Sequence, residues 1–335
     1  MTRHTPRRVF GPVMSRRLGR SLGVDPIPFK TCNQNCIYCQ LGRTRSFARR
    51  RRSFVSTTDI FSEIATALEH DRGAPIDWIT FVGSGETTLF AGLGPLIRFV
   101  KTMTEIPVAV ITNGTLLSHP EVRRELRTAD AVLPSIDAGD RELYQRINRP
   151  HPDLSFDRHI DGLMAFRQMY QGRLWIEVML VSGVNDTPEA LADLATVLTR
   201  IEPDEIHLST PTRPPAEPWV RPLNRSSLER AAAVFEPAAT VIIPEGVDDG
   251  FELAGELDRA LIEIVTRHPL REDEVRTIVE RQIRARTDIV LAELTESPEI
   301  RIVERLGDRF WCPAESDFPD PRPAGTPDAT AVIQA

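Results

Sequence analysis

Three cysteines lie within one stretch of eight residues, at Cys32, Cys36 and Cys39, in the spacing C-x3-C-x2-C. The chain of 335 residues has four cysteines, so most of its thiols are in this stretch. Thiolates are soft ligands that select zinc, copper(I) or iron–sulfur clusters. Three thiolates this close in sequence can bind one metal centre only where the chain forms a loop around it. We therefore expect a metal-binding loop here.

The spacing leaves two kinds of metal centre open. A disulfide framework is disfavoured, because an extracellular scaffold would need more paired cysteines in a shorter chain. Structural zinc normally takes four protein ligands, and the remaining cysteine, Cys312, is distant in sequence. A four-iron cluster held by three thiolates would leave one iron open to a substrate. The spacing favours a cluster over zinc.

Length and composition set the broad class. A chain of 335 residues can bury an ample core in one large or two medium domains. No run approaches the roughly 18 apolar residues of a membrane span, and the charged N-terminus has no apolar signal core behind it. We therefore expect a cytoplasmic protein without a membrane partner. The net charge of -7 argues against a surface that binds nucleic acid everywhere, while local patches stay possible.

Short apolar runs alternate with amphipathic segments from about Ser21 to Pro244, as a parallel α/β architecture requires. The runs that predict strands lie at residues 21–24, 78–82, 108–112, 131–137, 175–182, 205–211 and 240–244. The segments that predict helices lie at residues 58–71, 93–103, 120–127, 156–170 and 188–200. A proline-rich segment, residues 211–223, is too rigid for either, and we expect it to lie across the mouth of the sheet.

Five of these predicted strands end in, or are directly followed by, a cluster of small or polar residues. In parallel α/β folds the chemistry gathers at the carboxyl ends of the strands, so these clusters are expected to form the walls of one site. Each cluster alone has a plainer explanation, such as turn glycines or a helix cap. Their members are Gly83, Ser84, Gly85 and Glu86, then Asn113, Ser135 and Asp137, Ser182 and Asn185, and Ser209.

The cysteine motif, with Tyr38 before its last cysteine, resembles the signature of the radical S-adenosylmethionine (radical SAM) superfamily. The resemblance implies a partial (β/α)6 TIM-like barrel and a 4Fe-4S cluster bound by Cys32, Cys36 and Cys39. It also implies that S-adenosylmethionine (SAM) binds the open iron. Reductive cleavage of SAM would give a 5'-deoxyadenosyl radical that abstracts hydrogen from a substrate. An electron donor such as flavodoxin or ferredoxin would be a partner.

The same resemblance assigns roles to the residues at the strand ends. Gly83, Ser84, Gly85 and Glu86 match the family's Gly-Gly-Glu-like segment, which would accept hydrogen bonds from the methionine ammonium group, although Thr87 stands where many members have proline. The adenosine and carboxylate of SAM would be contacted by Tyr38, Asn113, Ser135, Asp137 and Val181, and Asn185 would face cofactor or substrate.

The pattern of predicted elements changes near residue 247, where the alternation of strands and helices ends. Three short helices and a hairpin are predicted up to Pro313, and together they resemble a winged-helix domain. We expect a core domain over residues 1–246, with a cysteine loop at 30–42, a winged-helix-like domain over 247–313, and a disordered tail over 314–335. Cys312 is expected to be a buried hydrophobic residue.

The sequence is compatible with a small molecule, a peptide or RNA as the substrate. Segments before the cysteines resemble a branch grouped with the tRNA wyosine-base synthases, whose chemistry uses a lysine imine and a second cluster. Wyosine synthesis is disfavoured, because cysteines for a second cluster are missing and the lysines are Lys30 and Lys101 alone. The competing, non-enzyme hypothesis is a metal-dependent regulator that binds DNA through its winged helix. Six arginines between residues 43 and 52 could bind phosphates or form a solvated loop.

Overall fold

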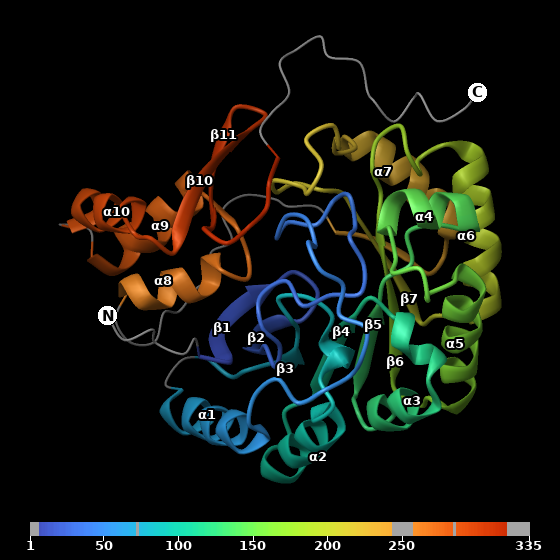
Figure 1. Cartoon of the computed structure of the whole chain (residues 1–335), viewed down its shortest axis with the longest axis horizontal. Coiled ribbons are helices and arrows are strands. Elements are labelled where there is room, and N and C mark those ends of the chain that lie inside the picture. Colours follow the sequence, from blue (N-terminus) through green and yellow to red (C-terminus); the bar gives the residue numbers. More distant parts are fainter. Residues whose placement is uncertain (1–6, 72–73, 243–256, 284–285, 320–335) are drawn as a thin grey trace.

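The computed structural model describes residues 7–71, 74–242, 257–283 and 286–319. Its largest element is an eight-stranded sheet in the order β1 to β8 (Figure 1). The strands of this sheet are β1 (Val9–Ser15), β2 (Gly19–Val24), β3 (Trp78–Phe81), β4 (Val108–Thr112), β5 (Ala131–Pro134), β6 (Arg173–Met179), β7 (Glu205–Ser209) and β8 (Ala239–Val241).

The sheet is almost entirely parallel. The hairpin of β1 and β2 is antiparallel and forms one edge, whereas each later strand runs parallel to the one before it. Parallel neighbours need a crossover connection, and the crossovers here are helical. From β2 to β8 the chain therefore forms six strand–helix units and a final strand, which confirms the predicted mixed α/β architecture and is consistent with a TIM-like barrel.

Helices cover the outer face of the sheet (Figure 1). Side-chain caps set where several of them begin: Ser56 accepts from the Asp59 amide before α1, and Thr187 accepts from the Ala190 amide before α6. The helices of this layer are α1 (Thr57–His70), α2 (Leu93–Met103), α3 (Pro120–Leu126), α4 (Arg141–Asn148), α5 (Phe156–Met169), α6 (Pro188–Ile201) and α7 (Arg225–Ala232).

The two faces of the sheet belong to different apolar clusters. Val108 and Val110 of β4 pack in the large core beneath the helices, whereas Ala109 between them belongs to a second cluster. This alternation is the period of two expected of a strand. The second cluster also contains Leu18, at the tip of the β1–β2 hairpin, and Trp175 of β6. The hairpin tip therefore packs against the inner face of the sheet.

The remaining elements form a separate unit with its own core around Trp311, here called the C-terminal module, residues 257–319. It lies beside β1 (Figure 1). Its strands pair in the order β10-β11-β9. Its elements are α8 (Leu257–Val265), β9 (Leu270–Arg271), α9 (Glu272–Ile283), α10 (Thr287–Thr295), β10 (Ile300–Arg305) and β11 (Asp308–Pro313).

The structure differs from the sequence prediction at several places. Strand β1 and helices α4 and α7 were not predicted, and β5 ends at Pro134, so Ser135 and Asp137 lie beyond it. The predicted boundary at residue 246 falls outside the described residues. Residues 314–319 are not a loose tail, because Phe318 is buried beside Phe310 and Cys312.

No helix among the described residues is long and apolar enough to cross a lipid bilayer.

The buried histidine of α5 predicts a pH dependence of stability. His159 is 4% exposed, and burial lowers its pKa from 6.5 to about 4. Below pH 6.5 the unfolded chain takes up a proton that the folded chain does not. The free energy of unfolding therefore falls between pH 6.5 and pH 4, by up to about 3 kcal/mol from this residue.

A His159→Gln variant should lose less unfolding free energy over this range, as measured by urea denaturation. His70→Gln, at an exposed position, is the control. Equal pH dependence in H159Q and the wild type would contradict this assignment.

Candidate functional site

The cysteine loop, residues 30–42, is joined directly to the turn that follows β3. The amide of Lys30 donates to the carbonyl oxygen of Ser84 at 2.5 Å, and the amide of Glu86 donates to that of Thr31 at 2.8 Å. Thr31 and Gly85 form a parallel bridge between these bonds. A Cβ atom at Gly85 would lie 1.9 Å from the Thr31 carbonyl oxygen, so the approach requires glycine. The loop and the turn are thus one backbone unit.

The far side of the loop is held by the end of α4. The amides of Asn35 and Ile37 donate to the carbonyl oxygens of Asn148 and Ile147, at 3.0 and 2.9 Å. The side chain of Ile37 is fully buried in an apolar cluster that includes Val181. The loop is therefore fixed at its start by the turn after β3 and through its middle by the end of α4.

Polar side chains face all three thiols. The ammonium group of Lys30 donates to Cys39 Sγ at 2.8 Å. The side-chain amides of Asn113 and Asn148 approach the sulfurs of Cys32 and Cys36 at 3.8 and 3.6 Å. The three cysteines are free and partly exposed.

Burial raises the pKa of the Cys32 thiol to about 11, and it also raises the pKa of Cys36. Near neutral pH these two thiols are therefore held protonated, even though the Lys30 ammonium group lies near Cys32 and lowers its pKa. A bound metal would favour their thiolates, because a coordinating thiol loses its proton.

Glu86 is buried in a cage of donors at the ends of β3 and β4. One carboxylate oxygen accepts from the Thr112 hydroxyl at 2.5 Å and from the Thr88 amide at 2.9 Å, and also from the Thr88 hydroxyl. The other accepts from the amide of Asn113 at 2.6 Å. Burial raises the pKa of Glu86, and these four hydrogen bonds oppose the increase. Glu86 therefore links two neighbouring strand ends and places Asn113 beside Cys32.

Asp137 forms a second buried centre. Its carboxylate accepts from the Tyr38 hydroxyl at 2.5 Å, from the Asn148 side chain at 2.6 Å and from the Met179 amide at 2.9 Å. Burial raises the pKa of Asp137 despite these bonds. Asn185 donates from its side chain to the carbonyl oxygens of Asp137 and Met179, both at 2.9 Å. Asp137 thus joins the cysteine loop to the ends of β5 and β6.

These contacts unite most of the predicted site residues at one edge of the sheet. That edge is formed by the carboxyl ends of the parallel strands, where active sites of such folds lie. A sequence profile described as the Radical SAM superfamily matches residues 27–195, which include the three cysteines, Glu86 and Asp137. The chain belongs to the radical SAM superfamily.

Related proteins whose matches cover a larger share of the chain support its membership of the superfamily. The chain is 33% identical to a UPF0026 protein of Methanocaldococcus jannaschii, over 81% of this chain and 85% of that protein. It is 42% identical to a protein named GTPase Obg in Brachyspira hyodysenteriae, over 71% of this chain, but it spans only 35% of that protein. A radical SAM methyltransferase structure from Sphaerobacter thermophilus aligns over 68% of each chain with a TM-score of 0.52 and 18% identity, which supports the fold.

Radical SAM enzymes use a 4Fe-4S cluster and SAM, and these are the cofactors of this superfamily member. The donor set fits the cluster, because three free thiols on one fixed loop face three side-chain donors that can stabilise thiolate charge. Among the described residues, no three His, Cys, Asp or Glu side chains are close enough to hold one metal ion. A four-iron cluster makes a different demand, because each thiolate binds a different iron.

Three more of the predicted site residues, Val181, Ser135 and Gly83, are packed against neighbouring residues. Val181 is fully buried in the cluster around Ile37. Ser135 is half-buried just beyond β5, and it forms a bridge with Glu177 of β6. Gly83 lies against Ile27, which would be 2.5 Å from an added Cβ atom.

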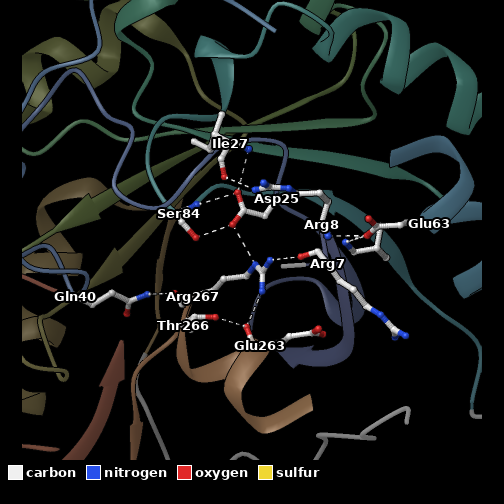
Figure 2. A network of polar contacts seen from close by, with 11 residues as sticks. Arg7, Arg8, Asp25, Ile27, Gln40, Glu63, Ser84, Glu263, Thr266 and Arg267 are labelled. Carbon is white, nitrogen blue, oxygen red and sulfur yellow. Dashed lines mark hydrogen bonds and ion pairs between the residues drawn. The ribbon is translucent and has the colours of Figure 1, made fainter. Parts of the chain in front are cut away.

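Sequence reasoning missed two residues of the site. Asp25 accepts from the Ser84 hydroxyl at 2.6 Å and from its amide at 3.1 Å, and so orients the turn after β3 (Figure 2). Asn148 contacts both Cys36 and Asp137. Asp25 directly follows a strand, so the rule applied to the other strand ends could have found it. Asn148 sits at the end of a helix that was not predicted, and its sequence carries no comparable signal.

The proline-rich segment contacts the cysteine loop through Glu217. Its amide donates to the carbonyl oxygen of Ile37 at 3.0 Å, and its buried carboxylate pairs with Arg43 and Arg149 at 2.7 and 2.5 Å. Most of the arginine run likewise has partners within the chain: Arg43 with Glu217, Arg45 with Asp317, Arg51 with Glu125, and Arg52 over Phe54.

The bridge between Thr31 and Gly85 predicts that Gly85→Ala damages the site. The new methyl group would collide with a backbone oxygen, and the forced shift should cost about 1–3 kcal/mol of unfolding free energy. It should also lower the iron content after anaerobic reconstitution, because Thr31 adjoins Cys32. Urea denaturation and iron analysis test both effects, with Ser46→Ala on the exposed continuation of the loop as the control. A G85A protein that matches S46A in both measurements would show that the bridge is dispensable.

Proposed function

We propose that this chain is a radical SAM enzyme in which Cys32, Cys36 and Cys39 bind the cluster and the turn from Gly83 to Glu86 binds the methionine part of SAM. When bound and reduced, the cluster would supply the electron that cleaves SAM to a 5'-deoxyadenosyl radical, which abstracts hydrogen from the substrate. One observation carries the proposal: the backbone of the cysteine loop pairs directly with that turn. The two cofactor sites would therefore be adjacent.

The residues around the pairing of the cysteine loop with this turn would have different roles in binding the two cofactors. Glu86 holds the turn and the end of β4 together, so that backbone carbonyls and its carboxylate can face an ammonium group. Tyr38 and Asp137, joined by a hydrogen bond, would line the adenosine side together with Asn113 and Ser135. Lys30 would stabilise the charge on Cys39. Val181 and Asn185 support this wall from the start of the loop after β6.

The C-terminal module is proposed to be winged-helix-like. Three helices and a three-stranded sheet in the order β10-β11-β9 support this reading. Its third helix, α10, has no Lys or Arg and exposes Ile289. Such a surface suits a protein or peptide better than the phosphates of a nucleic acid. An enzyme is favoured over a metal-dependent DNA regulator because superfamily membership and the strand-end site both point to catalysis.

The reaction class predicts a specific product. After anaerobic reconstitution with iron and sulfide, the wild-type protein should convert SAM to 5'-deoxyadenosine and methionine when dithionite is added. Cys36→Ala should abolish this conversion, because it removes one of the three thiol ligands. Liquid chromatography of the quenched mixture measures both products.

Cys312→Ala is the matched control, because Cys312 is buried in a small apolar cluster of the C-terminal module with Phe310 and Phe318. It should retain the cleavage activity. Cleavage that survives in C36A, or that is absent from a wild-type protein holding a full complement of iron, would contradict the proposed function.

A further inference from the structure

Arg267 projects from the C-terminal module into a buried position beside β1 (Figure 2). Its Nε donates to Asp25 Oδ2 at 3.1 Å, its Nη1 donates to the carbonyl oxygen of Glu263 at 2.8 Å, and its Nη2 donates to the carbonyl oxygen of Arg7. The guanidinium also lies over the ring of Phe10, 4.8 Å from its centroid. Each guanidinium nitrogen thus has a partner, and the side chain is fixed in place.

The ion pair between Arg267 and Asp25 is a buried link between the C-terminal module and the rest of the chain. The side chains are 9% and 2% exposed. A carboxylate this deeply buried needs a charged or hydrogen-bonding partner. The same carboxylate of Asp25 holds both the hydroxyl and the amide of Ser84, in the turn after β3. If Arg267 were removed, the buried carboxylate of Asp25 would lose its ion-pair partner, and Arg8 would remain as a cation near it. The turn that Asp25 orients would then be held less firmly.

The same segment of the module also contacts the cysteine loop. The side-chain amide of Gln40 lies 3.4 Å from the carbonyl oxygen of Arg267 and 3.4 Å from Nδ1 of His268. Gln40 directly follows Cys39. Residues 267 and 268 therefore contact the cysteine loop directly through Gln40, and Arg267 reaches the turn after β3 through Asp25.

We propose that Arg267 is a positioning residue, which holds the SAM-binding turn through Asp25 and Ser84 and so couples docking of the C-terminal module to SAM binding. This inference rests on the proposed function, since it assumes that the turn binds SAM. Coupling is reciprocal, so bound SAM would in turn strengthen docking of the module. The C-terminal module would then contribute to the cofactor site, in addition to offering a surface to a protein or peptide partner.

Hydrogen–deuterium exchange of the full chain tests the structural half of the proposal without any cofactor. In Arg267→Met, the amides of residues 30, 84 and 86 should exchange about tenfold faster or more, because each is bonded within this junction. Arg259→Gln is the control, since Arg259 lies on α8, just before the turn that carries Arg267, and pairs with Glu263 and Glu299 inside the module. Unchanged exchange at these three amides in R267M would overturn the proposal.

SAM binding by the cluster-loaded protein tests the functional half. Equilibrium dialysis should give a Kd for SAM about tenfold higher in R267M than in the wild type or R259Q, at equal iron content. Arg267→Lys, which keeps the charge but loses the branched contacts, should lie between them. This milder variant also keeps the test valid if R267M folds poorly. Faster exchange at the turn with an unchanged Kd would overturn the coupling to SAM.

The two proposals fail in different ways. A wild-type protein that binds a cluster but no SAM would refute the proposed function, and with it the coupling to SAM, while the exchange data would still decide whether Arg267 holds the turn. A wild-type protein that binds SAM, with R267M binding it equally well, would refute the role of Arg267 alone.

Discussion

The short backbone pairing between Thr31 and Gly85 is the constraint on which the rest of this structure depends. It fixes a loop of three thiols to the end of a parallel strand, and it tolerates no side chain at Gly85. The parallel sheet supplies the strand end, and Glu86 ties that end to the end of β4. Asp137 joins the loop to the ends of β5 and β6, and α4 holds the loop from the other side. A loop without regular structure thereby gains a defined position.

Much of this arrangement could be predicted from the sequence. The strands at residues 78–81 and 108–112 are apolar runs with clear ends, and parallel strands place their carboxyl ends at one edge, so Glu86 and Asn113 were expected together. Strand β1 was missed because Gly11 and Pro12 interrupt it at a bulge. Asp25 directly follows β2, so the rule for strand ends could have found it had it been applied there. The role of Asn148 was missed because its partner Cys36 lies 112 residues away in sequence, where local patterns carry no information.

The C-terminal module changes how the site is understood. From the sequence it was expected to be a separate winged-helix-like domain, and its own core around Trp311 agrees with a separate unit. Its contacts, however, reach Asp25, Gln40 and the proline-rich segment, where Arg213 donates to the carbonyl oxygen of Pro269 at 2.6 Å. Buried polar contacts of this kind are costly to break one at a time. The module therefore adjoins the candidate site.

The central claim is that three thiols on this loop bind one four-iron cluster with an iron left open for SAM. Electron paramagnetic resonance of the reconstituted, dithionite-reduced protein tests it most directly. The account predicts the signal of a reduced 4Fe-4S cluster whose spectrum changes when SAM is added, because SAM binds the open iron. A protein that holds zinc and gives no such signal, or a cluster whose spectrum is unaffected by SAM, would contradict the account.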